Sequence, residues 1–264
     1  MDQLYEIYTN RLKRIDTEFV RYLHSKINWK SRLIVITGAR GVGKTTMLLQ
    51  HIKLNKIENH SLYLSADSIY FAENTLYNVA SKFCKLNGKF LFIDEVHKYK
   101  NWSVEVKMMY DNLPDLNIVV TGSSVLDISK GLEADLSRRA IAYNLEGLSF
   151  REYLNFTLGT NINSVSLQNI LSHSYSLPEN ISHPISYWVE YLKVGYYPFF
   201  KEDNFYTRLD NVVNQTLEVD IPTYANMNVS TSVKLKRLLY IIARSVPFKP
   251  NITEIGRAIG ADRG

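Results

Sequence analysis

The stretch that decides the fold is Leu33–Thr45, which reads LIVITGARGVGKT. Its first half has the composition of a buried β-strand, and its second half, from Gly38 to Thr45, fits the P-loop pattern G-x-x-x-x-G-K-[ST]. A helix is expected to follow over residues 45–54, so the loop joins a strand to a helix, as the motif requires. The stretch therefore predicts a phosphate-binding loop, and a chance glycine-rich loop is the alternative.

Each part of this loop has a chemical task. Glycines let backbone N–H groups turn inward around phosphate oxygens, and the helix N-terminus adds partial positive charge. The Lys44 ammonium is expected to reach the β- and γ-phosphates, and the Thr45 hydroxyl to ligate Mg²⁺. No guanine-reading N-K-x-D element follows a later strand, so ATP with Mg²⁺ is the expected ligand. The residues expected to contact the nucleotide are Gly38, Ala39, Arg40, Gly41, Val42, Gly43, Lys44, Thr45 and Thr46.

A second motif, Phe90–Glu95, follows about fifty residues after the loop lysine. Four apolar residues lead into Asp94 and Glu95, so two carboxylates stand at the C-terminal edge of a buried strand. We expect Asp94 to hold Mg²⁺ and Glu95 to polarise the attacking water as general base. The alternative is an ordinary strand end with a helix cap. His97 has no second His or Cys at ligand spacing, so we interpret it as a structural residue or as one that supports the neighbouring site residues.

A third apolar run, Asn117–Val120, ends in the polar sequence Thr121-Gly122-Ser123-Ser124. A hydroxyl at this strand end is expected to contact the γ-phosphate or the attacking water. Ser123 is taken as the catalytic candidate, but the sequence does not decide between Thr121 and Ser123. The alternative is a Gly/Ser turn after a strand.

Further apolar runs alternate with helical stretches up to about residue 148. They lie at residues 61–64 and 140–143, and their continuous apolarity indicates strands buried on both faces. Strand–helix alternation predicts an α/β fold with a parallel, doubly wound sheet, here a P-loop NTPase core. The expected domains are a core with N-terminal helices over 1–148, a helical lid over 149–245 and a partial helix-turn-helix unit over 246–264.

Composition excludes several classes of protein. The 264 residues carry a single cysteine, Cys84, which rules out a disulfide framework and suits a reducing cytoplasm. No apolar run approaches the roughly 20 residues of a membrane span, and the N-terminus lacks a signal-peptide pattern. The net charge of +5 resides in residues 231–264, where seven basic residues meet two acidic ones. That stretch is either a solvated helix face or a contact for nucleic acid.

Motifs beyond the loop resemble a bacterial and archaeal family of AAA-type ATPases, over about residues 30–264. The segment Asp94–Lys98 followed by Trp102 is similar to the family's D-E-[IV]-[QH]-K…W, and Thr121–Ser124 is similar to its G-S-S strand end. The remaining similar segments are Ser137–Arg139, Leu148–Leu154, Tyr191-Leu192 and Gly195–Pro198.

The resemblance implies an arginine finger at Arg139, presented to the γ-phosphate of a neighbouring subunit in a homo-oligomer. Arg138 stands where the family has glycine, so the sequence offers two adjacent arginines and the choice between Arg138 and Arg139 stays open. A second departure is Gly147, which stands where the family has proline. A solvated arginine pair or an internal ion pair is the alternative. Full-length relatives often carry a further nuclease-like domain, which this chain is too short to hold.

The C-terminal residues Ile252–Ala261 read as the first helix and turn of a helix-turn-helix, with Gly260 in the turn. The recognition helix is expected near Asp262, but the sequence stops at Gly264, so we expect a fragment of a longer protein. DNA is therefore a possible partner through an incomplete unit.

Three functions fit these motifs. The first is an ATPase that hydrolyses MgATP to drive a conformational change in a partner or assembly. The second is a slow-turnover, nucleotide-dependent switch or DNA-binding regulator, and the third is a P-loop kinase. Glu95 favours hydrolysis because it supplies a base for water.

Overall fold

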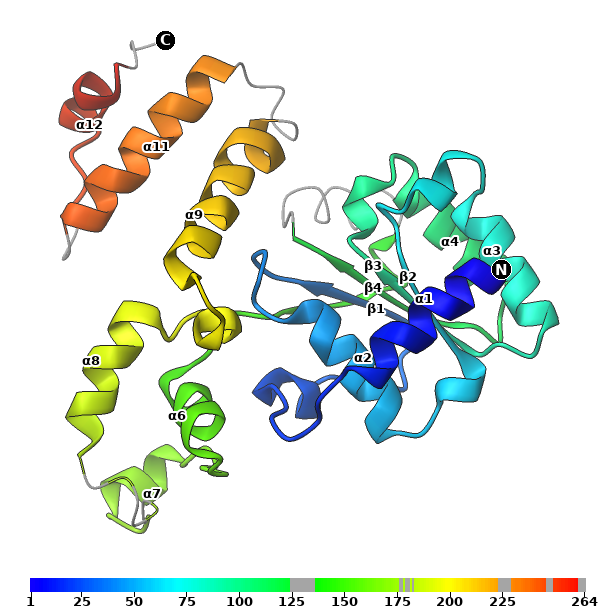
Figure 1. Ribbon diagram of the computed structural model, residues 1–264, viewed down its shortest axis with the longest axis horizontal. Helices are drawn as coiled ribbons and strands as arrows, with labels where there is room; N and C mark the ends of the chain where they lie inside the picture. The colour runs from blue at the N-terminus through cyan, green and yellow to red at the C-terminus, as the bar shows by residue number, and fades with distance from the viewer. Residues whose placement is uncertain are drawn as a thin grey trace. The chain divides into compact units, whose positions relative to one another are not determined.

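The structure is a computed structural model that divides into two compact units, Met1–Glu202 and Asp203–Gly264 (Figure 1). It describes residues 1–123, 136–175, 178, 181, 183–222, 229–245 and 249–260. Ser124, one residue of the predicted strand-end motif, lies outside the described residues, as do residues 261–264 at the expected start of the recognition helix.

The first unit is built on a five-stranded sheet with the strand order β2-β3-β4-β1-β5. Every paired neighbour runs parallel, so the predicted parallel α/β sheet is confirmed. Strands β1 to β4 are almost wholly buried, whereas the edge strand β5 is largely exposed. The strands are β1 Leu33–Thr37, β2 Ser61–Ser65, β3 Phe90–Asp94, β4 Asn117–Gly122 and β5 Ile141–Asn144.

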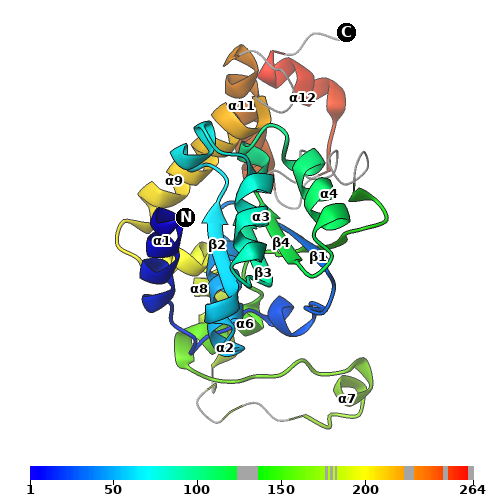
Figure 2. The ribbon, with the colours of Figure 1, turned by 90° about the vertical axis from the view of Figure 1, so that its right-hand side faces the viewer.

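Helices cover both faces of this sheet. The chain crosses from β1 to β2 in one direction and returns through β3 and β4 in the other. Because such crossovers are nearly always right-handed, the helix after β1 lies on one face and the helices after β2 and β3 lie on the other (Figure 2). The helices are α1 Asp2–Lys13 and α2 Lys44–Leu54 on one side, and α3 Leu76–Lys85 and α4 Trp102–Asn112 on the other.

The described residues of the first unit include the further helices α6 (Phe150–Leu158), α7 (Leu167–Leu171) and α8 (Pro184–Val194). Helix α6 begins with a capping box, in which Ser149 caps the backbone of Glu152 and the Glu152 carboxylate accepts from the Ser149 backbone. This pairing gives a physical reason for the Ser and Glu of the Leu148–Leu154 motif. A small aromatic core holds α6 to α8, with Tyr153, Leu154 and Ile181 at its centre and Phe150, Tyr191 and Phe200 around them.

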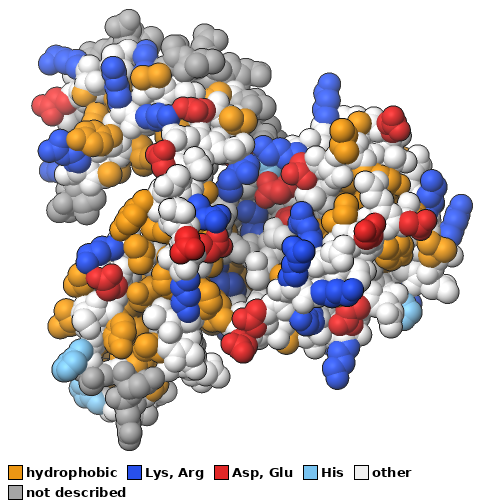
Figure 3. All heavy atoms as spheres, viewed as in Figure 1, with side chains coloured by type: hydrophobic (Ala, Val, Ile, Leu, Met, Phe, Trp, Pro, Cys, Tyr) orange, Lys and Arg blue, Asp and Glu red, His pale blue; other side chains and the backbone are white. Residues whose placement is uncertain are grey.

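One face of α8 is exposed and apolar. Ile185, Trp188, Val189 and Leu192 follow the helical spacing and are each at least 41% exposed. Figure 3 shows hydrophobic side chains gathered over this part of the first unit. A contiguous apolar face is typical of a surface that contacts another protein.

Arg21 ties the N-terminal segment to α6 and to the P-loop. Its guanidinium, 6% exposed, donates to the Glu152 carboxylate at 2.9 Å and to the backbone oxygen of Gly147 at 2.9 Å. It also donates to the backbone oxygens of Val42 and Glu146. Burial by itself would raise the pKa of Glu152, but the hydrogen bond and charge of Arg21, together with the backbone N–H groups of Ser149 and Tyr22, hold that pKa below its usual value.

The predicted domain boundaries do not coincide with the two compact units. The boundary expected after residue 148 falls inside the first unit, because the Arg21–Glu152 pair joins α6 to the N-terminal segment. The boundary expected after residue 245 falls inside the second unit, where α12 packs against α11.

The second unit is helical in its described parts. It contains α9 (Phe205–Gln215), a π-helical turn η7 (Thr216–Asp220), α11 (Val229–Arg244) and α12 (Ile252–Ile259). Asn251 caps the start of α12, and Gly260 ends it in the left-handed conformation with φ of 67°. Across the described residues of both units, no helix combines the length and apolar character that a membrane crossing needs.

The buried Arg21–Glu152 pair generates a stability prediction. Arg21→Ala should lower the free energy of unfolding by about 3–5 kcal/mol, because it leaves a buried carboxylate without its partner. Since the folded state lowers the pKa of Glu152, the pair stabilises at neutral pH, and the loss should shrink as pH falls through the folded pKa. Urea unfolding at several pH values measures both effects.

The matched control is Arg14→Ala, which removes an exposed arginine from the same segment and should change stability by about 0.5 kcal/mol or less. The double variant Arg21→Ala with Glu152→Gln should recover part of the loss, because no buried charge is left unpaired. Equal unfolding midpoints for Arg21→Ala and Arg14→Ala would contradict this account.

Candidate nucleotide-binding site

The loop after β1 has the backbone shape that its glycines permit. Gly38, Gly41 and Gly43 have φ values of 148°, 85° and 98°, which side-chain-bearing residues rarely adopt. A Cβ atom at Gly38 would also lie 2.2 Å from the backbone oxygen of Leu145. Gly43 precedes α2, which begins at Lys44, one residue earlier than predicted. The predicted strand–loop–helix arrangement is present.

Lys44 lies inside this loop and is 5% exposed. Its ammonium donates to the backbone oxygen of Gly38 at 2.8 Å and to that of Ala39 at 3.0 Å. The other side of the loop is held by Arg21, which donates to the backbone oxygen of Val42. Lys44 therefore binds the backbone at the start of the loop, and Arg21 binds the backbone near its end.

Asp94, at the end of β3, joins four elements through its buried carboxylate. Its Oδ2 accepts hydrogen bonds from Thr45 Oγ1 at 2.5 Å and from Tyr63 OH at 2.7 Å. Its Oδ1 accepts from Thr121 Oγ1. The Tyr63 hydroxyl in turn accepts from Arg11 of α1 at 2.7 Å. The predicted Mg²⁺ ligands Thr45 and Asp94 are therefore in direct contact.

This donor set suits Mg²⁺. The ion prefers oxygen ligands and is usually held by one or two carboxylates together with substrate phosphates and water. Within the ranges that the structure describes, no cluster of three or more His, Cys, Asp or Glu side chains is arranged to hold a metal. The buried Asp94 carboxylate beside the Thr45 hydroxyl fits Mg²⁺, whose remaining ligands would be phosphate oxygens of the nucleotide and water.

Glu95 follows Asp94 and adopts a left-handed backbone conformation, with φ of 51° and ψ of 40°. This conformation costs a residue with a side chain on the order of 1–2 kcal/mol. Its Oε2 lies 3.1 Å from Ser123 Oγ and 3.5 Å from His97 Nε2. Burial raises the pKa of the Glu95 carboxyl, and Asp94 adds to this rise while Lys44 opposes it.

The structure separates the two sensor candidates. Thr121 is fully buried, donates to Asp94 and accepts from the Glu95 backbone N–H. Ser123 instead donates its hydroxyl to the carboxylate of Glu95. Thr121 therefore supports the strand end, and Ser123 contacts the Glu95 carboxylate, while its role as a sensor stays a prediction.

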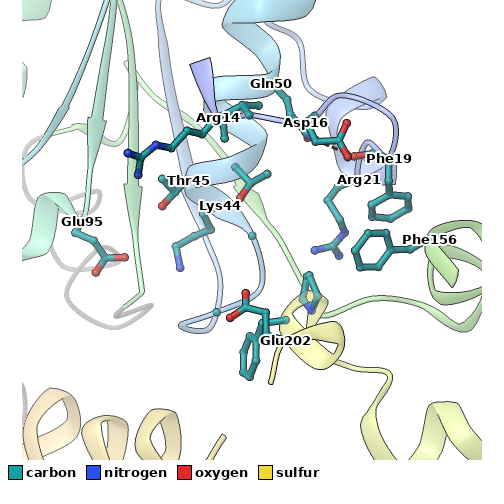
Figure 4. Close-up of a pocket in the computed structure, with 16 residues that line it drawn as sticks. Arg14, Asp16, Phe19, Arg21, Lys44, Thr45, Gln50, Glu95, Phe156 and Glu202 are labelled. Atoms are coloured by element: carbon teal, nitrogen blue, oxygen red, sulfur yellow. Dashed lines mark hydrogen bonds between the residues drawn. The ribbon is translucent and has the colours of Figure 1, made fainter. Parts of the chain in front are cut away.

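A cavity of about 560 Å³ opens beside the loop. This volume lies within the usual range of ligand pockets, about 300–1,000 Å³. Lys44 and Glu95 line it from α2 and from the end of β3 (Figure 4). Gly41, Gly43, Thr45 and Thr46 also line it, so it contains much of the predicted nucleotide contact set.

Aromatic residues that the sequence did not single out form the apolar wall of this cavity. Phe19 and Phe156 stack with ring centroids 4.8 Å apart, and Pro198 and Phe199 add to the wall (Figure 4). Phe199 also packs against the loop at Gly41. A Cβ atom added at Gly41 would lie 2.7 Å from the Phe199 ring. The Gly195–Pro198 motif was the available sequence signal for this segment, and nothing in the sequence marked Phe19.

Arg139 does not line the cavity of its own chain. Its guanidinium makes two contacts with Asp111 of α4, at 2.9 Å and 3.1 Å. It also lies over the Tyr110 ring. This is the internal ion pair that the sequence left as an alternative, and a role in a neighbouring subunit stays a prediction.

Comparisons with known proteins agree with the geometry. The family model of the AAA domain matches residues 30–154, which carry the loop, the Asp94–Glu95 pair and the start of α6. The chain has the P-loop and the parallel sheet of a P-loop NTPase, and this part of it is similar to the AAA domain, as the motifs predicted.

Two uncharacterized proteins of Methanocaldococcus jannaschii are similar to the chain. One is 28% identical over 257 residues, covering 89% of this chain and 54% of that protein. The other is 31% identical over 179 residues, covering 64% of this chain and 36% of that protein. The chain thus spans about half the length of the first relative and about a third of the second.

Solved structures show a low similarity. AMPPCP-bound DnaA from Aquifex aeolicus has a TM-score of 0.38 and 15% identity, over 96% of this chain and 82% of DnaA. A closed state of Hsp104 has a TM-score of 0.48 and 15% identity, over 89% of this chain and 45% of Hsp104. The fold is therefore assigned from the strand order and the loop geometry.

The position of Lys44 in the loop generates a binding prediction. Lys44→Ala should weaken the affinity for ATP and ADP about 10- to 100-fold, because a charge-assisted contact to phosphate is removed. Isothermal titration calorimetry measures both affinities. Lys82→Ala, on the exposed side of α3, is the matched control and should bind like the wild type. An unchanged affinity in Lys44→Ala would contradict the phosphate site.

Proposed function

We propose that the chain binds MgATP and hydrolyses it to drive a conformational change in a partner or an assembly. The observation that carries this proposal is the cavity that Lys44 and Glu95 line together, next to the Thr45–Asp94 contact. A cation for the phosphates, two oxygen ligands for Mg²⁺ and a carboxylate for water are the parts that hydrolysis needs.

Each residue has a distinct part in the proposed reaction. The loop amides and Lys44 bind and orient the phosphates. Thr45 and Asp94 would hold Mg²⁺, which would offset the negative charge of the phosphates. The Glu95 carboxylate accepts a hydrogen bond from the attacking water and then takes its proton as the water attacks. The raised pKa of Glu95 makes it a stronger base than an exposed carboxylate, while Lys44 helps to keep it ionised.

Adenine is proposed to lie against the apolar wall. Phe19 and Phe156 present aromatic surface at the end of the cavity away from Glu95 (Figure 4). Aromatic faces stack favourably on flat ring systems.

The proposed partner is a second copy of the chain. A homo-oligomer would let Arg139 reach a neighbouring γ-phosphate, if its contact with Asp111 is exchanged on assembly. The apolar face of α8 offers a surface for such contacts.

Helix α12, which ends at Gly260, supports the alternative of a nucleotide-dependent switch that binds DNA through the start of a helix-turn-helix. The helical stretch after residue 148 is proposed to act as a lid.

Glu95→Gln tests the proposed hydrolysis. The variant keeps the shape of the side chain but removes the charge that polarises water, so kcat should fall about 10²- to 10⁴-fold. MgATP affinity should stay within about twofold, since Glu95 is not proposed to bind phosphate. Phosphate release and calorimetry measure the two quantities. Wild-type turnover in Glu95→Gln would show that another group is the base.

Arg139→Ala tests the role across a subunit interface. Turnover should fall without loss of ATP affinity, because the arginine acts on the transition state of a neighbouring site. Mixing Arg139→Ala with Glu95→Gln protein should restore some activity, since mixed neighbours can combine an intact Glu95 with an intact Arg139. Light scattering verifies that the two variants assemble together. An absence of recovery in mixed assemblies would restrict Arg139 to its pair with Asp111.

A further inference from the structure

His97 lies in the 3-10 turn η4 (Val96–Lys98), directly after the two carboxylates. Its side chain is 3% exposed, so the imidazole is held in place by packing. Its Nε2 atom faces Ser123 Oγ at 3.2 Å and Glu95 Oε2 at 3.5 Å. The distance to Ser123 is that of a hydrogen bond, whereas the distance to Glu95 is at its limit.

The direction of the hydrogen bonds follows from proton counting. A serine hydroxyl carries a single proton, and Ser123 donates it to Glu95 Oε2 at 3.1 Å. The His97 nitrogen that faces the same hydroxyl must then donate its own N–H to Ser123 Oγ. The result is a chain of two hydrogen bonds, from His97 to Ser123 and from Ser123 to Glu95.

This chain acts on one oxygen of the carboxylate. Within the described residues, the hydrogen-bonding neighbours of the Glu95 side chain lie at Oε2. With Oε2 anchored, the Glu95 side chain loses rotamers that point away from the cavity it lines. Hydrogen bonds in such a chain also polarise and strengthen one another.

We propose that His97 is a positioning residue for hydrolysis, which fixes the Glu95 carboxylate through Ser123 and leaves Oε1 for the attacking water. The inference rests on the proposed function, because Glu95 must be the base for its position to affect the rate. His97 acts through its neighbours and touches no reacting atom. It therefore controls kcat without contributing to nucleotide affinity.

The test compares three substitutions of His97 in the full chain. In glutamine the side-chain nitrogen lies as many bonds from Cα as Nε2 does in histidine, so His97→Gln should keep the donor and retain most of kcat. His97→Asn has the same amide but cannot reach, and His97→Phe fills the space without a donor. Both should lower kcat about tenfold, with KM and the Kd for MgATP unchanged.

Two controls separate this inference from the function on which it rests. His60→Gln changes an exposed histidine that precedes β2, at the end of the parallel strands opposite to Glu95. This variant should behave like the wild type. Adding His97→Asn to Glu95→Gln should lower kcat no further, because the group that His97 positions is already disabled. An active Glu95→Gln would overturn the proposed base and the inference together.

The inference alone fails if Glu95→Gln is inactive while His97→Asn and His97→Phe keep the wild-type kcat. It also fails if all three substitutions lower kcat and thermal stability equally, because His97 would then only support the fold. His97→Asn retains a polar side chain of smaller size, so the comparison of Gln with Asn decides the question even where His97→Phe does not fold.

Discussion

The buried carboxylate of Asp94 is the constraint on which the rest of the site depends. A buried charge is tolerated only when its oxygens are hydrogen-bonded, and Asp94 accepts from Thr45, Tyr63 and Thr121. These partners belong to the P-loop helix, to β2 and to β4. Satisfying one carboxylate therefore sets the register of three neighbouring elements and brings the loop to the edge of the sheet.

A second buried charge does the same for the opposite wall of the cavity. Arg21 holds the outer side of the loop at Val42 and meets Glu152 at the start of α6. Its other contacts go to the backbone oxygens of Glu146 and Gly147. The N-terminal segment, the loop and α6 thus share one guanidinium, which explains why α6 belongs to the same compact unit as the sheet.

The Glu95 carboxylate, which we propose as the base, is placed by local strain and by its neighbours together. Strand β3 ends at Asp94. Glu95 follows it in the left-handed conformation, and the Glu95 side chain lines the cavity. Strained backbone of this kind is typical of functional sites, where surrounding contacts compensate its energetic cost. Here Thr121 bonds the Glu95 backbone and Ser123 bonds its side chain.

The sequence by itself determined the parallel sheet, the loop over Gly38–Thr45 and the carboxylates Asp94 and Glu95. These follow from apolar runs and glycine spacing, which are local properties of the chain. Only the tertiary structure decided that Arg21 binds the loop, that Phe19 and Phe156 form one wall, and that Ser123 rather than Thr121 contacts the Glu95 carboxylate. Such pairings join residues far apart in sequence, and a single arginine or phenylalanine has no local signature that distinguishes a buried contact from an exposed one.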